Sequence, residues 1–299
     1  MMLISGPGSE QVGGEIAGIL GVEAAVVEHR VFPDGENYIR LTAEVGGRDV
    51  VLVQSTAPSQ DRRLVQLLLT LDAIREGEPK SVAVVSPYMA YARQDRRRLP
   101  GEAVSARTVI RLLLSIGVSR LFTVNVHNPA VFEGSGLGLT DISAIPLLAK
   151  HLEGRGLGGS FSLSLGKKPV DLEHSMEAAS VLGGGHAHLE TFRDPTTGEV
   201  HLGGAEFDVG GRRVIVFDDV ITSGGTHLGA VRLLRGMGAS EAHLACVHSL
   251  LSDENLERVL GEVDSFTYTD TVHGRFSGVK VAPLIAGALR RYLRDVESE

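Results

Sequence analysis

Residues 214–226 read VIVFDDVITSGGT. Four apolar residues run directly into Asp218 and Asp219, and a glycine pair follows between small hydroxyl residues. A short, continuous apolar run bounded by turn residues is typical of a strand buried on both faces of a parallel sheet. The stretch therefore predicts a buried strand with two carboxylates at its carboxyl end, then a loop that enters a helix near His227.

The two halves of this stretch suit the two ends of a sugar phosphate. Open α/β folds bind ligands at the carboxyl ends of their strands, where carboxylates accept hydrogen bonds from ribose hydroxyls or hold Mg²⁺ through its waters. In the loop, glycines let consecutive N–H groups point inward and the helix start adds its positive end, so a phosphate is favoured. The predicted phosphate-binding residues are Thr222, Ser223, Gly224, Gly225 and Thr226. A plainer alternative is a tight turn in which Asp218 and Asp219 cap the following helix.

Strand-like and helix-like patterns alternate along the rest of the chain. Apolar runs at 50–55, 81–86 and 121–126 predict further buried strands. Between the first two, leucines and an isoleucine recur at helical spacing over 64–74, so a helix connects the strands as in a βαβ unit. The alternation predicts an α/β fold with mostly parallel sheets covered by helices.

A weak internal duplication divides the chain. Residues 50–87 and 214–249 share the order strand, polar loop, helix, turn and strand, but only the second copy contains the acid pair and the glycine pair. We therefore predict an N-terminal domain at 1–145 and a C-terminal domain at 146–299, the second carrying the sugar phosphate loop.

The composition limits the kinds of partner. The 299 residues carry a formal charge of −8, which argues against binding to nucleic acid, because that requires a basic surface that neutralises phosphates. No apolar run approaches the ~20 residues that cross a bilayer, and the first residues do not form a signal peptide. We expect a cytoplasmic protein with no membrane partner.

Several segments together resemble one family. Residues 214–226 are similar to the ribose 5-phosphate loop of proteins with the type I phosphoribosyltransferase fold. Residues 32–40 (FPDGENYIR), 86–106 (SPYMAYARQDRRRLPGEAVSA), 126–129 (VHNP) and 269–272 (TDTV) resemble the ribose-phosphate pyrophosphokinase family in its archaeal form. The likeness covers nearly the whole chain and implies two tandem type I phosphoribosyltransferase-like domains.

The resemblance also implies a reaction and an assembly. In this family the anomeric hydroxyl of ribose 5-phosphate attacks the β-phosphorus of MgATP, giving phosphoribosyl pyrophosphate and AMP. A neighbouring subunit helps to bind ATP through its Phe-x-Asp-Gly-Glu segment, so a homodimer or hexamer is implied. The expected small-molecule partners are therefore ATP and ribose 5-phosphate, with Mg²⁺ as the cofactor.

The residues expected to bind ATP lie in two segments. Phe32 offers a flat face on which adenine can stack, and Asp34 and Glu36 offer acceptors for its amino group, although such a segment taken alone is more often a turn. The second segment is a basic run in an acidic protein, and it contains Arg93, Gln94, Asp95 and Arg96. Arginine binds polyphosphate by bidentate, charge-assisted bonds, whereas an isolated basic run is commonly a solvated surface.

The catalytic residues implied by the resemblance are Arg193 and His127, and His127 also helps to place magnesium. Three positions depart from the family pattern. Asn125 replaces an aspartate, Lys168 stands where an acid is usual, and Thr191 replaces the lysine of the catalytic loop. A threonine cannot supply positive charge to the transferring group.

Two functions follow from these residues. The first is a working ribose-phosphate pyrophosphokinase, which is either slow or obtains the missing charge from Lys167 or Lys168. The second is a non-catalytic member that binds ribose 5-phosphate or nucleotide and regulates an active paralogue in a mixed oligomer. A nucleobase phosphoribosyltransferase is a weaker alternative, because those enzymes lack the segments at Phe32 and Arg93.

Overall fold

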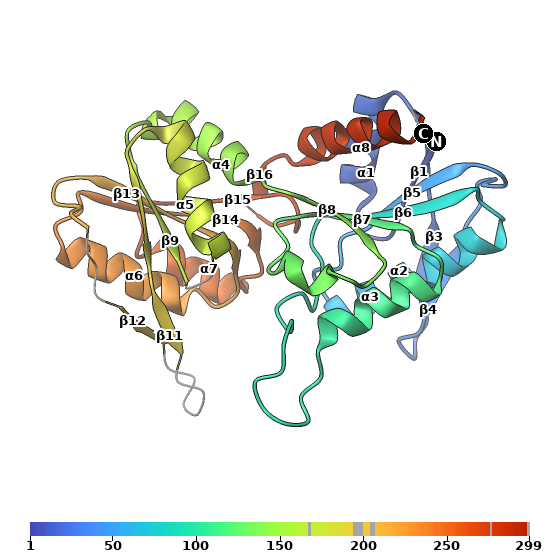
Figure 1. Ribbon diagram of the computed structural model, residues 1–299, viewed down its shortest axis with the longest axis horizontal. Coiled ribbons are helices and arrows are strands. Elements are labelled where there is room, and N and C mark those ends of the chain that lie inside the picture. The colour runs from blue at the N-terminus through green and yellow to red at the C-terminus, as the bar shows by residue number, and fades with distance from the viewer. Residues whose placement is uncertain (167–168, 194–199, 204–206, 276, 298–299) are drawn as a thin grey trace. The chain divides into compact units, whose positions relative to one another are not determined.

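The computed structural model describes residues 1–166, 169–193, 200–203, 207–275 and 277–297. The chain divides into two compact units, Met1–Ile142 with Lys280–Glu299, and Ser143–Val279. Each unit contains a parallel sheet with helices packed against it (Figure 1). In the part of the chain that is described, no helix has the length and apolar character needed to cross a bilayer.

The first unit is built on a six-stranded sheet with the order β2-β1-β5-β6-β7-β8, and all neighbouring strands pair in parallel. Its strands are β1 (Met2–Ser5), β2 (Glu23–Val26), β5 (Asp49–Val53), β6 (Ser81–Ser86), β7 (Arg120–Val124) and β8 (Gly138–Ile142). An antiparallel hairpin consists of β3 (Glu28–Val31) and β4 (Asn37–Arg40). The helices are α1 (Glu10–Leu20), α2 (Gln60–Glu76), α3 (Ser105–Ser115), the 3₁₀ helix η1 (Pro129–Phe132) and α8 (Ala282–Glu297).

The second unit is built on a six-stranded sheet with the order β10-β9-β13-β14-β15-β16, again parallel throughout. Its strands are β9 (Phe161–Leu165), β10 (His186–Leu189), β13 (Arg213–Ile221), β14 (Glu241–Ser249), β15 (Ser265–Thr269) and β16 (Ser277–Val279). An antiparallel hairpin consists of β11 (Thr191–Arg193) and β12 (Val200–Leu202). The helices are α4 (Ile145–Leu152), the π-helix η2 (Glu153–Leu157), α5 (Pro169–Leu182), α6 (Gly225–Gly236) and α7 (Asp253–Leu260).

The two sheets have the same topology. In the first sheet β1 lies between β2 and β5, and the β3–β4 hairpin comes between β2 and β5 in the sequence. In the second sheet β9 lies between β10 and β13, and the β11–β12 hairpin comes between β10 and β13 in the sequence. Strand β5 therefore corresponds to β13, and the loops that follow them occupy equivalent places. This arrangement confirms the predicted α/β fold, in which each half of the chain is built on a parallel sheet covered by helices.

Helices on both faces of the second sheet account for the apolar run that precedes the acid pair. The residues from Val214 to Phe217 are each 0% exposed. Val214 and Val216 join a core cluster with residues of α6 such as Leu228, while α4 and α5 contact β9, β13 and β14. Because neither face of β13 meets water from Val214 to Phe217, alternation with polar residues is absent there, as expected for a doubly covered parallel strand.

Two boundaries next to the acid pair differ from the prediction. The strand does not end at Phe217, because Val220 and Ile221 still pair with β14. Helix α6 begins at Gly225 rather than near His227, since Gly224 already serves as its N-cap. The acid pair therefore lies within β13, and the polar loop is shorter than the sequence suggests.

The C-terminal segment groups differently from the predicted ranges 1–145 and 146–299, because Lys280–Glu299 belongs to the first unit. Helix α8 packs against α1 and contacts β8. Its Tyr292 ring meets the Phe122 ring edge-on, with 5.4 Å between the centroids. Such packing joins segments far apart in the chain, which no local sequence pattern specifies.

Candidate functional site

The acid pair lies where β13 loses one of its neighbouring strands. Strand β9 pairs with β13 only as far as Ser164, opposite Phe217, whereas β14 continues beside Asp218 and beyond. The side chain of Asp218 is 18% exposed and Asp219 is buried. The two carboxylates therefore stand just past the carboxyl end of β9, the edge at which parallel α/β sheets bind their ligands.

Asp218 is held through both of its carboxylate oxygens. Oδ1 accepts a hydrogen bond from the N–H of Asp219 at 2.8 Å, and Oδ2 lies 2.6 Å from Nε2 of His227. Burial raises the pKa of Asp218 to about 6, the contact with His227 opposes this shift, and the charge of Asp219 adds to it. Oδ1 of Asp219 accepts a hydrogen bond from the N–H of Val220 at 2.8 Å. Adjacent carboxylates with fixed orientations suit a pair of ribose hydroxyls, because an ionised carboxylate is purely an acceptor.

The predicted phosphate loop is shaped by a glycine in the left-handed region. Gly224 has a φ of 75° and is the N-cap of α6, so no side chain there caps the helix. The first N–H groups of any helix lack intrahelical partners and lie at the positive end of its dipole. Strand β13, Gly224 and α6 therefore place the acid pair and the positive end of a helix dipole within one short segment.

Helix α7 supports this loop from a distant part of the sequence. Nη2 of Arg258 donates a hydrogen bond to the carbonyl oxygen of Ser223 at 2.5 Å. A Cβ at Gly224 would lie 2.8 Å from Cγ2 of Val259, so the loop and the helix are in close contact. Sequence reasoning missed these supporting residues and missed the contact made by His227. The position of His227 directly after the loop is a local signal, whereas Arg258 and Val259 offer none.

The segment predicted to bind adenine is a turn that joins β3 to β4. Phe32 is 37% exposed, and the guanidinium carbon of Arg30 lies 4.9 Å from the centroid of its ring and 4.5 Å from that of Tyr38. Asp34 stabilises the turn, because its Oδ1 accepts a hydrogen bond from the N–H of Glu36 at 3.1 Å. A base that stacks on Phe32 therefore uses the face opposite Arg30, or it displaces the guanidinium.

The predicted polyphosphate segment follows β6 and is mostly exposed. Arg93, Gln94 and Arg96 face solvent, whereas Asp95 is 9% exposed. Asp95 accepts a hydrogen bond from Nδ2 of Asn128 at 2.5 Å. This bond ties the loop after β6 to the segment after β7 that carries His127, so two of the predicted binding segments meet at the carboxyl edge of the first sheet.

The two residues at the predicted metal position differ in burial. Asn125 is 6% exposed and has a φ of 41°, a left-handed conformation that Asn and Asp adopt more readily than most residues. This backbone conformation suits an asparagine as well as an aspartate, but the amide of Asn125 lacks the negative charge and has a donor in place of one acceptor. His127 is half-buried. In the described residues, no three His, Cys, Asp or Glu side chains come together as a metal cage.

The predicted catalytic loop is described in part. Thr191 begins β11, pairs with Leu202 of β12 and is half-buried. Arg193 ends β11, but its side chain lies outside the described part of the chain, and so does Lys168. The hairpin that carries Thr191 and Arg193 occupies in the second unit the place that the Phe32 hairpin occupies in the first.

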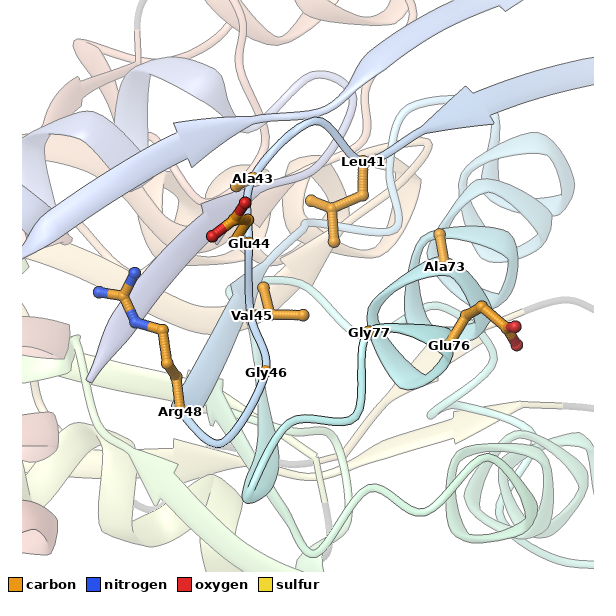
Figure 2. A pocket seen from close by; sticks show the side chains of 9 residues that line it. All are labelled: Leu41, Ala43, Glu44, Val45, Gly46, Arg48, Ala73, Glu76 and Gly77. Carbon is orange, nitrogen blue, oxygen red and sulfur yellow. The ribbon is translucent and has the colours of Figure 1, made fainter.

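Figure 2 shows the residues that line a hollow in the first unit. Its volume is about 600 Å³. It adjoins the amino end of β5 and the last turn of α2, the edge opposite the one at which Arg93 and Asp95 follow β6. The lining residues are Leu41, Ala43, Glu44, Val45, Gly46, Arg48, Ala73, Glu76 and Gly77. None of the predicted ligand-binding residues lines it, so we assign it no part in the reaction.

Known proteins match the chain along most of its length. Residues 1–117 match the family model described as the N-terminal domain of ribose phosphate pyrophosphokinase, and residues 186–272 match a phosphoribosyl transferase domain. A ribose-phosphate pyrophosphokinase from Methanopyrus kandleri is 38% identical over 290 residues, which are 97% of this chain and 98% of that protein. The chain belongs to the ribose-phosphate pyrophosphokinase family. This confirms the resemblance inferred from the sequence motifs.

Other members of the ribose-phosphate pyrophosphokinase family are similar over the same extent. The protein of that name from Methanosarcina acetivorans is 36% identical over 97% of this chain and 100% of its own. The crystal structure of phosphoribosylpyrophosphate synthetase from Mycobacterium smegmatis superposes with a TM-score of 0.85 at 26% identity, covering 98% of this chain and 99% of that one. The two-unit fold is therefore the fold of the family, and the roles of individual side chains here remain predictions.

Proposed function

We propose that this chain is an active ribose-phosphate pyrophosphokinase, which makes phosphoribosyl pyrophosphate and AMP from ATP and ribose 5-phosphate in nucleotide biosynthesis. The anomeric oxygen of the sugar forms a bond to the β-phosphorus of ATP. The bond from that phosphorus to the α,β-bridging oxygen breaks, AMP leaves with this oxygen, and the hydroxyl proton passes to water. The names of its relatives support turnover over the non-catalytic alternative.

The arrangement of Asp218, Asp219 and the Gly224 loop is the observation that carries this proposal. The carboxylates accept hydrogen bonds from the ribose hydroxyls, and the N–H groups at the start of α6 bind the 5-phosphate. Phosphoryl transfer depends mainly on alignment and charge neutralisation, with little covalent participation by the enzyme. Holding the sugar at both ends orients its anomeric oxygen, which is the contribution this unit makes.

ATP is assigned to the other predicted segments. Phe32, Asp34 and Glu36 bind the adenine, and the basic segment from Arg93 to Arg96 binds the polyphosphate. Because the family binds ATP partly through a neighbouring subunit, we propose that a second copy of this chain completes the nucleotide site in a homodimer or hexamer. We place this assembly in the cytoplasm.

The residues near His127 fit a magnesium ion that is bound chiefly by the substrate. Mg²⁺ keeps several waters and phosphate ligands and takes one or two protein groups, so a dedicated cage is not required. His127 would hold it on the protein side, and Asn125 adds no charge there. When bound, the ion neutralises negative charge on the polyphosphate. The chain itself orients the two substrates and supplies the cation of Arg193.

A direct assay tests this function. The purified chain, incubated with ATP, Mg²⁺ and ribose 5-phosphate, is expected to form AMP and phosphoribosyl pyrophosphate in equal amounts. The absence of AMP above the buffer control, with ribose 5-phosphate still raising the melting temperature, would instead establish the non-catalytic binding member. Phosphate release or consumption of a nucleobase would indicate a different phosphoribosyl chemistry.

Replacing Thr191 by lysine is expected to raise turnover. A preorganised cation on the transferring group is worth ~10³-fold or more in related phosphoryl transfers, and Thr191 stands where the family has one. For Thr191→Lys we expect kcat to rise about tenfold, the gain being limited by any charge that Lys167 or Lys168 already supplies. Initial rates of AMP formation at saturating substrates measure this.

Thr191→Met is the matched control, because the methionine side chain is similar in length to that of lysine and carries no charge. Its kcat should stay at the level of the unchanged chain. Equal rates for Thr191→Lys and the unchanged chain would show that no cation is missing at this position.

A further inference from the structure

His227 is a buried histidine that the family resemblance does not assign to the site. It is 7% exposed and lies in the first turn of α6. Its Nε2 is 2.6 Å from Oδ2 of Asp218, nine residues earlier in β13. An ionised carboxylate only accepts hydrogen bonds, so the proton of the pair lies on Nε2 when Asp218 is ionised.

This contact decides the orientation of the Asp218 carboxylate. The terminal torsion of an aspartate is broad and roughly two-fold, so a carboxylate held at one oxygen can still turn. In this site Oδ1 is bound by the N–H of Asp219 and Oδ2 by His227. With both oxygens held, the remaining lone pairs of Asp218 point in set directions, as two neighbouring hydroxyls of one ring require.

The same contact connects the two ends of the sugar site. Asp218 belongs to the strand that carries the hydroxyl-binding acids, whereas His227 belongs to the helix whose start forms the phosphate loop. Their hydrogen bond joins β13 to the first turn of α6, and Gly224 lies in the segment between the two bonded residues. The separation between the carboxylates and the phosphate-binding N–H groups is therefore fixed by this pair.

We infer that His227 is a positioning residue for ribose 5-phosphate: it orients Asp218 and sets the spacing between the hydroxyl-binding acids and the phosphate loop. This inference rests on the proposed function and adds a residue to it. The competing explanation is that His227 is a core histidine whose contact with Asp218 only stabilises the fold. The two explanations differ in whether the affinity for the sugar depends on a donor at Nε2.

Three substitutions at this position separate the explanations. His227→Met is apolar and removes the donor, His227→Gln places an amide N–H near the position of Nε2, and His227→Asn has an amide that falls short of it. For His227→Met we expect the KM for ribose 5-phosphate to rise about tenfold, the usual effect of losing one hydrogen bond to a charged group. The KM for ATP should stay within about twofold, because the change concerns one substrate.

The rescue is the decisive comparison. His227→Gln should restore the KM for ribose 5-phosphate to within about threefold of the unchanged chain, and His227→Asn should not. Calorimetric titration with ribose 5-phosphate in the absence of ATP should give the same order of affinities. Melting temperatures of all three variants show whether each is folded.

The second unit offers a matched control in another buried histidine that contacts a carboxylate. His243 is 4% exposed, and its Nε2 lies 3.0 Å from Oε2 of Glu241 at the amino end of β14, away from the acid pair. His243→Met should lower the melting temperature and leave the KM for ribose 5-phosphate unchanged.

The outcomes distinguish this inference from the proposed function. The inference is overturned if His227→Met binds the sugar as tightly as the unchanged chain, if both KM values rise together, or if His227→Gln is no better than His227→Asn. The proposed function fails separately, when the unchanged chain makes no AMP. In that case the calorimetric order of the variants still decides the role of His227.

Discussion

Gly224→Ala is expected to lower kcat/KM for ribose 5-phosphate about 100-fold, the effect of displacing a binding group by roughly 1 Å. Gly224 has a φ of 75°, a conformation that costs an alanine roughly 1–2 kcal/mol. The added Cβ would also lie 2.8 Å from Cγ2 of Val259, which is 0% exposed. Either the loop or α7 has to shift, and the N–H groups at the start of α6 move with it.

Steady-state kinetics with ribose 5-phosphate as the varied substrate measure this effect. Gly236→Ala is the matched control, because Gly236 lies in the same helix and a Cβ added there would meet no described atom within 4 Å other than those of its chain neighbours and of its own helix backbone. That substitution should leave activity unchanged and raise stability by about 0.4–1 kcal/mol.

A second substitution separates the two sources of strain at Gly224. Adding Val259→Ala to Gly224→Ala removes the steric contact and keeps the backbone conformation, so we expect part of the activity to return. Full affinity for ribose 5-phosphate in Gly224→Ala alone, with only a lower melting temperature, would contradict the role given to the left-handed turn.

The sequence was sufficient to predict the fold, and to predict that the acid pair and the glycine pair lie between a buried strand and a helix. Continuous apolar runs predicted the doubly covered strands because burial on both faces removes the polar alternation. The acid pair and the glycine pair predicted a ligand-binding site at the carboxyl edge of the sheet. Both motifs consist of a few consecutive residues, so they can be recognised without knowledge of tertiary contacts. The boundaries of β13 and α6 were less accurate, since Val220 and Ile221 extend the strand only through their pairing with β14.

Contacts between distant residues could not be predicted in this way. Arg258 reaches Ser223 from another helix, and α8 packs on the first unit although it ends the chain. Each of these contacts follows from tertiary packing, and no spacing of residues in the sequence specifies it.

Asp219→Asn is expected to weaken binding of ribose 5-phosphate about 10- to 100-fold, because a hydrogen bond that involves a charged group contributes roughly 1.5–3 kcal/mol. The amide keeps the shape of the side chain and can still accept from the N–H of Val220. It loses the negative charge and replaces one acceptor by a donor that a ribose hydroxyl does not need. Calorimetric titration with the sugar measures the change.

The matched control is Asp208→Asn. Asp208 is an exposed aspartate of the same unit, and its Oδ1 also accepts a hydrogen bond from a nearby backbone N–H, that of Gly210, at 2.9 Å. Asp208→Asn should leave the affinity unchanged. Unchanged affinity in Asp219→Asn would show that Asp219 serves only the backbone.

Stability should change in the opposite direction from affinity in Asp219→Asn. The pKa of Asp218 is raised to about 6 by burial and, to a smaller extent, by the charge of Asp219. A carboxyl group whose pKa is higher in the folded state contributes stability at low pH that is lost as the pH rises through about 6. Removing the charge of Asp219 lowers the pKa of Asp218, so the variant should lose less stability over this range. A melting temperature at pH 7.5 above that of the unchanged chain, together with weaker binding, would identify Asp219 as a residue kept for the ligand at a cost in stability. A fall in both quantities would indicate that Asp219 supports the fold instead.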